Sequence, residues 1–211
     1  MSFPLTLLAG PRALATIQRD GLTPDRVEHV IGGAGGPKAL GLVGLDAALF
    51  GHWLTPGPAP RWLMGSSIAT WRFLCALHPD PATMFPTFAR HYLDMTFSAK
   101  ARREEIDATT GRMLMALLTA CGGAEPVLAH PHYRLALICA RSRGPVSSEN
   151  AWMLAPLLGS AFLLNWLTPR FGGAFFERAV LHDARGVPPL LPALQGRPRS
   201  RRSRPTRSCM R

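Results

Sequence analysis

Short apolar runs that end at glycines, each followed by a helical pattern, mark the first half of the chain. Residues Val27–Ile31 form a β-prone run that ends in the glycine cluster Gly32–Lys38. A helical stretch follows over Ala39–Phe50, with leucines at the spacing of one helix face. This order predicts a strand, a glycine-rich turn and a helix.

The same order returns after a loop rich in proline and glycine. Arg61–Met64 predicts a second strand, and Gly65–Ala69 predicts a tight turn. The residues after the turn have a helical pattern through about Leu77. The next two predicted elements are both helices, Pro81–Phe97 and Arg103–Cys121.

Two further apolar runs predict strands in the second half. Tyr133–Ala140 is predicted to be buried, and Phe175–Leu181 is predicted to be another strand. A chain in which strands alternate with helices, with glycine turns between them, is typical of a parallel sheet with right-handed crossovers. The predicted fold class is therefore α/β, with a parallel sheet and flanking helices.

One long apolar segment lies between these two strands. Ala151–Thr168 contains no charged residue over eighteen positions, which is the lower limit for crossing a bilayer. Pro156, Gly159 and Asn165 interrupt it. We therefore expect a buried or membrane-facing helix and not a membrane span.

The charge of the chain is concentrated at one end. The formal net charge is +11 over 211 residues, and seven arginines lie in residues 197–211, where no acidic residue occurs. Without those seven arginines the charge falls to +4, which is ordinary for a soluble domain. The body of the chain is therefore not a basic nucleic-acid-binding module.

The turn at Gly65–Ala69 has the pattern G-x-S-x-[GA], with Ser67 at its centre. A nucleophile elbow needs small residues on both sides of the serine because it is a strained turn from a strand into a helix. Gly65 and Ala69 are these small residues. The alternative is a plain tight turn in which a serine caps the helix. Ser66 is adjacent, but the spacing favours Ser67 as the nucleophile.

The glycine cluster before the first helix supports the elbow interpretation. Its backbone N–H groups can face an oxyanion beside a helix N-terminus. A P-loop is excluded because Pro37 precedes Lys38 and Ala39 follows it. A dinucleotide fingerprint is excluded because Lys38 stands where its third small residue would be.

These two motifs together resemble the patatin-like phospholipases. That family carries G-G-G-x-[RK]-G as its oxyanion loop, and Ala34–Ala39 matches it with alanine at both ends. Gly44–Leu49 falls where the family has a G-V-L-x-x-L helix. The stretches G-G-P-K and G-S-S-I-A-T-W-R-F resemble, in particular, an uncharacterised bacterial branch of this family. The resemblance extends over about Val27–Leu194.

The resemblance implies a patatin-like parallel-sheet sandwich with flanking helices and a carboxylic ester hydrolase with a Ser–Asp dyad. Ser67 would attack the ester carbonyl, and the backbone amides of Gly35, Gly36 and Lys38 would hold the oxyanion. The implied substrate is a lipid or other ester, with no cofactor. A lipid hydrolase of this kind is compatible with peripheral contact with a membrane.

The acid partner of the family's dyad has no match by motif. The family's Asp lies in D-G-[GA], and neither D-G-G nor D-G-A occurs in this chain. The nearest candidate is Asp183, at the end of the last predicted strand, and we interpret it as a turn residue because no glycine follows it. The predicted hydrolase domain, residues 1–196, is then incomplete at its C-terminus, and little or no hydrolase activity is expected.

The sequence changes character after Gly196. Residues 197–211 contain only Arg, Pro, Ser, Thr, Cys and Met. One interpretation is a solvated basic tail for nucleic acid or acidic lipid. We favour a shifted reading frame in GC-rich DNA, because the tail interrupts an α/β pattern that still lacks strands. Two alternatives stay open. One is a non-catalytic protein that associates with a membrane or with nucleic acid through the tail and the Ala151–Thr168 helix. The other is a pseudoenzyme without the general base.

The remaining chemistry-bearing residues do not change this interpretation. His130 and His132 lack a third ligand at a suitable spacing, and Pro131 between them favours a turn, so no metal site is predicted. The four cysteines form no C-x-x-C pair. With no signal-peptide pattern in Met1–Gly10, we expect a cytoplasmic location.

Overall fold

The computed structural model describes residues 6–54, 56–57, 59–144, 151–167, 175–188 and 190. The chain divides into two compact units, Met1–Leu135 and Ala136–Arg211. The Arg-rich segment 197–211 lies outside the described residues. The limits of the predicted 1–196 domain therefore stay a prediction.

The described residues form a mixed α/β protein with one four-stranded sheet, in the order β1-β2-β3-β4. Strand β1 (His29–Gly32) pairs in parallel with β2 (Arg61–Gly65), and Gly32 lies opposite Gly65. Strand β3 (Tyr133–Ser142) begins in the first unit and continues in the second. There it pairs with β4 (Phe176–His182), in antiparallel orientation. The α/β class predicted from the sequence is confirmed.

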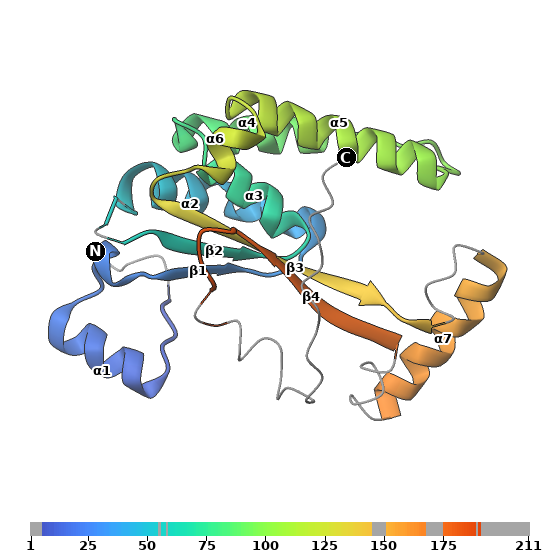
Figure 1. Ribbon diagram of the computed structural model, residues 1–211, viewed down its shortest axis with the longest axis horizontal. Helices are drawn as coiled ribbons and strands as arrows, with labels where there is room; N and C mark the ends of the chain where they lie inside the picture. The colour runs from blue at the N-terminus through green and yellow to red at the C-terminus, as the bar shows by residue number, and fades with distance from the viewer. Residues whose placement is uncertain are drawn as a thin grey trace. The chain divides into compact units, whose positions relative to one another are not determined.

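Helices α2, α3, α4 and α5 gather over one face of the β1–β2 pair (Figure 1). The helix predicted directly after Ser67 is confirmed, as are the two predicted after Pro81. Neither α1 nor α6 was predicted from the sequence. The helices of the first unit are α1 (Pro11–Asp20), α2 (Val43–Ala48), α3 (Ile68–Ala76), α4 (Pro81–Leu93), α5 (Arg103–Ala120) and α6 (Ala124–Leu128), with a short 3-10 turn at Pro24–Arg26.

The single helix predicted over Ala39–Phe50 is wrong in detail. The segment starts as a 3-10 helix over Gly36–Leu42, becomes α2, and ends as a π-helical turn over Leu49–Trp53. Glycines inside a helix weaken it, and Gly41 and Gly44 both lie in this stretch. A segment that starts in a tight glycine loop can therefore take the 3-10 form before it becomes α-helical.

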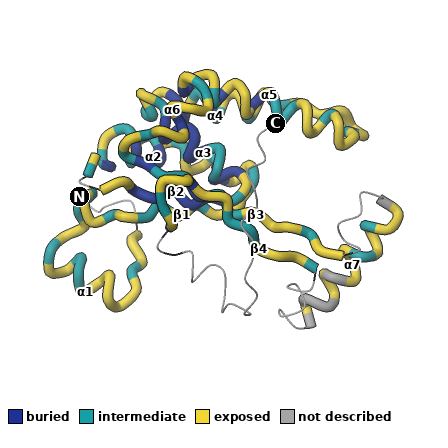
Figure 2. The backbone as a smooth tube through the Cα atoms, viewed as in Figure 1, coloured by how far each residue is buried: buried dark blue, intermediate teal, exposed yellow. Residues whose placement is uncertain are grey.

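The core of the first unit lies between the β1–β2 pair and its helices. Every residue of β2 is buried, as is most of α3, and Figure 2 shows these two elements as the darkest part of the unit. Phe50 lies at the centre of an aromatic cluster, with ring centroids 5.7 Å from Phe85, 6.1 Å from Tyr133 and 6.2 Å from Phe73. The Tyr133 hydroxyl donates to the Leu54 carbonyl at 3.2 Å. These contacts pack the π-helical turn before β2 against α3, α4 and the start of β3.

The parallel arrangement predicted for the last two strands is wrong. β3 and β4 form an antiparallel ladder that runs from Ala136 opposite His182 to Ser142 opposite Phe176. Helix α7 (Ala151–Leu167) lies in the connection, but it joins neighbouring strand ends and makes no crossover. Burial also differs from the prediction, because the second half of β3 is mostly exposed.

Helix α7 matches the predicted apolar segment in its limits but not in burial. Among its described side chains none is buried, and Trp152 and Trp166 are 90% and 80% exposed. In the part of the chain that the structure describes, no helix has both the length and the apolar character needed to cross a membrane.

Candidate active site

Ser67 lies at a sharp turn between β2 and α3 and has an unusual backbone. Its φ of 56° and ψ of −128° make it the only residue other than glycine with positive φ among the described residues. A side chain in this region is strained, and such strain concentrates at functional sites. The serine is exposed, and its hydroxyl does not cap the helix. Ser67 thus occupies the N-cap position of α3, but its hydroxyl makes no capping hydrogen bond.

Close packing behind the turn explains why its neighbours are small. A Cβ on Gly65 would lie 3.0 Å from Phe73 Cδ2 and 3.0 Å from the Thr70 nitrogen. A Cβ on Gly32 would lie only 2.6 Å from the Ala69 Cβ. The strand ends and the first turn of α3 thus touch, and larger residues would push the helix away from the sheet.

Gly32 is a site residue that the sequence analysis missed. It ends β1 and lies opposite Gly65, so the two glycines let α3 approach both strands. The signal was present, since Gly32 is the first glycine of the cluster, but the cluster was interpreted only as an oxyanion loop.

We expect Gly32→Ala to lower the free energy of unfolding by about 1–3 kcal/mol, because overpacking against the Ala69 Cβ has no flexible side chain to relieve it. Urea denaturation measures the change. Gly33→Ala is the matched control, since an added Cβ there meets no atom within 4 Å, and it is expected to stay within about 0.5 kcal/mol of wild type. Equal effects of the two substitutions would contradict the packing argument.

The glycine loop and the serine turn leave neighbouring strands at the same edge of the sheet. The Ser66 N–H donates to the Gly32 carbonyl at 3.3 Å, which ties the end of β1 to the start of the turn. Parallel strands direct their carboxyl ends to one edge, and ligand sites of α/β proteins form there. The glycine loop, which starts at Gly33, and the Ser67 turn therefore start next to each other.

The predicted oxyanion donors differ in whether their backbone N–H already makes a hydrogen bond. Gly36 has a φ of +51°, a conformation that favours glycine, and space for a Cβ is open there. The Lys38 N–H donates to the Gly35 carbonyl at 3.3 Å, so this amide is already part of the 3-10 turn. Gly35 and Gly36 remain the predicted donors in the loop.

The amide of Ile68 is a further candidate donor that the sequence analysis did not name. Ile68 is the first residue of α3, directly after Ser67, and its side chain is buried. The N–H groups of a first helical turn have no partner within the helix, and they lie at its positive end. In serine hydrolases with such an elbow, the amide after the nucleophile serves the oxyanion hole.

A buried ion pair connects the two helices that follow these loops. Arg72 on α3 donates to both carboxylate oxygens of Asp46 on α2, with each N–O distance 2.5 Å. Asp46 is 3% exposed and Arg72 is 9% exposed. A planar guanidinium facing a carboxylate with two hydrogen bonds fixes orientation as well as distance. The pair therefore holds the helix after the glycine loop against the helix after Ser67.

Asp183, the weak acid candidate, belongs to the second unit and follows β4. It is 8% exposed, and its carboxylate accepts from the Arg185 backbone N–H at 2.8 Å and from the Arg185 guanidinium at 2.6 Å. This hydrogen bond raises the pKa of Arg185. The residues after Asp183 form a turn, as the sequence predicts.

Other titratable residues have structural partners. Nδ1 of His130 accepts from the backbone N–H groups of His132 and Tyr133, each at 3.2 Å, which fits the predicted turn. Cys75 and Cys121 are buried, and burial raises the pKa of both thiols. Cys209 lies outside the described residues.

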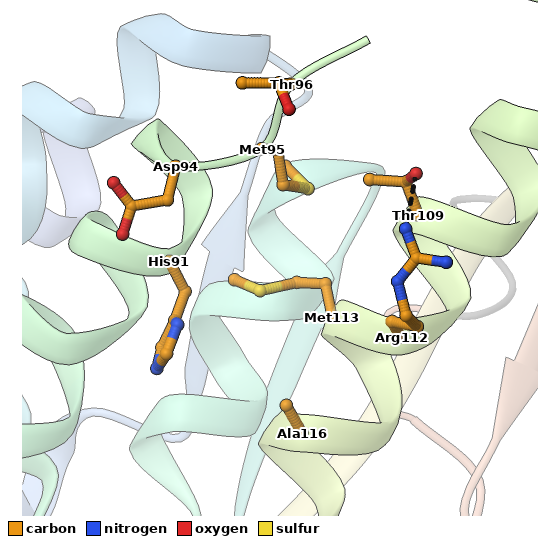
Figure 3. A pocket seen from close by; sticks show the side chains of 8 residues that line it. All are labelled: His91, Asp94, Met95, Thr96, Thr109, Arg112, Met113 and Ala116. Atoms are coloured by element: carbon orange, nitrogen blue, oxygen red, sulfur yellow. Dashed lines mark hydrogen bonds between the residues drawn. The ribbon is translucent and has the colours of Figure 1, made fainter.

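A separate hollow of about 300 Å³ lies between the C-terminal end of α4 and the face of α5 (Figure 3). Arg112 Nη2 donates to Thr109 Oγ1 at 3.0 Å on its wall. None of the residues predicted for the active site lines this hollow. The residues that line it are His91, Asp94, Met95, Thr96, Thr109, Arg112, Met113 and Ala116.

Comparisons of this chain with protein-family models, with curated proteins and with solved structures find no match.

Proposed function

We propose that this chain is a serine acyl hydrolase of patatin-like type, acting on a lipid or other ester, with Ser67 as its nucleophile. The observation that carries the proposal is the backbone conformation of Ser67, strained and exposed on a turn from a buried strand into a helix. Such a turn presents the hydroxyl to a carbonyl carbon while keeping the small residues behind it packed.

The chemistry follows from the positions of these groups. Ser67 Oγ attacks the ester carbonyl, and its proton passes to a general base. The oxyanion is held by the amides of Ile68 and of the glycine loop, at Gly35 and Gly36. The alcohol leaves with a proton, and water then hydrolyses the acyl-serine to release the carboxylic acid.

The proposed mechanism requires a carboxylate as the general base. Asp183 carries the only carboxylate suggested by the sequence, and Arg185 engages it in the turn. When one member of a complete serine triad is removed, the oxyanion hole and substrate binding alone still accelerate hydrolysis by about 10³–10⁴ over water. We therefore expect acyl transfer from activated esters to be measurable even if turnover is slow.

The acylation rate of the chain with p-nitrophenyl butyrate tests the oxyanion loop. Gly36→Ala is expected to lower this rate at least about tenfold, since an alanine resists a φ of +51° and misplaces the amide. Gly41→Ala is the control, because it lies in the same 3-10 segment without positive φ and without a close neighbour. Unchanged acylation in Gly36→Ala would remove the loop from the mechanism.

A further inference from the structure

Helix α7 of the second unit is apolar on all sides. Its seventeen residues, Ala151–Leu167, include no Asp, Glu, Lys, Arg or His. Trp152, Phe162, Leu163 and Trp166 are 90%, 74%, 60% and 80% exposed. A helix that is apolar all round is ordinarily buried in a large core or in lipid. The exposure of α7 therefore calls for a covering partner.

Within its unit, α7 lies at one end of the β3–β4 pair. It lies in the connection at the end of the β3–β4 hairpin, where Ser142 is opposite Phe176 (Figure 1). The Arg143 N–H donates to the Phe175 carbonyl at 2.8 Å, which closes the ladder at this tip. The helix is thus carried at the end of a two-stranded arm.

The last rungs of the arm are basic. Arg141, Arg143 and Arg178 are exposed there, and Glu177 is the one acidic residue among them. Glu177 is paired with Arg143, with Nη2 2.6 Å from Oε2, and this contact lowers the pKa of Glu177. Among the described residues of these last rungs, three arginines and one glutamate carry a net positive formal charge. Anionic lipid headgroups complement this charge, and acyl chains complement the helix.

The dimensions of α7 favour binding along a bilayer surface. Seventeen helical residues span about 26 Å, less than the roughly 30 Å of a hydrocarbon core. Trp152 in the first turn and Trp166 in the last turn place indole rings at both ends, and indole favours the headgroup boundary. We propose that α7 and the arginines of the β3–β4 tip bind an anionic lipid surface, with the apolar side chains of α7 among the acyl chains and the arginines at the headgroups.

The test is co-sedimentation of the full chain with vesicles of phosphatidylcholine alone and of phosphatidylcholine mixed with phosphatidylglycerol. Wild type is expected to bind the mixed vesicles more tightly, and added salt is expected to weaken binding. The triple variant Trp152→Ser, Phe162→Ser, Trp166→Ser is expected to lower the partition coefficient at least about tenfold.

The matched control replaces exposed apolar residues elsewhere, as the triple variant Leu8→Ser, Leu93→Ser, Met115→Ser, whose wild-type side chains are 94%, 70% and 60% exposed. It is expected to bind vesicles as wild type does, and so is Ser67→Ala, which separates this proposal from acyl transfer. Equal binding by wild type and the α7 variant would overturn the proposal. So would a wild-type dimer that does not bind vesicles and that the α7 variant dissociates, because a second copy would then cover the helix.

Discussion

Ser67→Ala is expected to abolish the release of one equivalent of p-nitrophenolate from p-nitrophenyl butyrate, while Ser66→Ala retains it. Removing the serine nucleophile of a complete serine hydrolase lowers kcat by about 10⁶, as much as removing the whole triad. Ser66 is not expected to replace Ser67 as the nucleophile, because it has neither the positive φ nor the central position of the motif.

Stopped-flow absorbance measures this release, and circular dichroism checks that both variants stay folded. The two serines are adjacent, so Ser66→Ala controls for any general disturbance of the turn. Loss of the signal in Ser66→Ala with retention in Ser67→Ala would show that the nucleophile is assigned to the wrong residue. A Ser67-independent release would point to surface chemistry such as lysine acylation.

Breaking the ion pair of Asp46 and Arg72 is expected to give the second largest effect. Asp46→Ala leaves the Arg72 guanidinium buried without its carboxylate, and such a loss costs about 3–5 kcal/mol of unfolding free energy. The double variant Asp46→Leu, Arg72→Met removes both charges and is expected to recover most of this loss, because an apolar pair of similar volume avoids the desolvation cost.

A surface pair gives the matched control for this comparison. Arg103 and Asp107 lie one helical turn apart on α5 with an N–O distance of 3.5 Å, and both side chains are about two-thirds exposed. Asp107→Ala is expected to change the unfolding free energy by less than about 1 kcal/mol. Urea denaturation of the four proteins measures all of these values. A destabilisation by Asp46→Ala no larger than that by Asp107→Ala would contradict the proposed role of the buried pair.

The serine turn could be predicted from the sequence because its signals are local. The pattern Gly65–Ala69 needs only five residues, and it lies between a short apolar run and a largely apolar helical segment. The structure has the strand, the turn and the helix at these residues. The positive φ of Ser67 follows from the same local constraint.

Contacts between distant segments could not be predicted in the same way. Asp46 and Arg72 are 26 residues apart, and nothing in the sequence indicates that two charged side chains meet inside the core. Gly32 is similar, because its role depends on the approach of Ala69 from the next helix. Both features become visible only once β1 and β2 pair in register.

The hydrophobic pattern predicts that the last two strands exist but not how they pair. Both were recognised as strands, but an apolar helix between two strands suggests a parallel crossover. Whether the chain crosses the sheet or turns back depends on where α7 packs, and its apolar pattern has no polar face to indicate this. The antiparallel pairing of β3 and β4 therefore had no local signal.

The most direct measurement of the central claim is peptide mapping by mass spectrometry after the full chain reacts with a fluorophosphonate. This probe forms a stable phosphonyl adduct with an activated serine at an elbow and oxyanion site. We expect one adduct, on Ser67, that disappears in Ser67→Ala and persists in Ser66→Ala. An unmodified Ser67 in a folded chain, or an adduct spread over several surface serines, would contradict it.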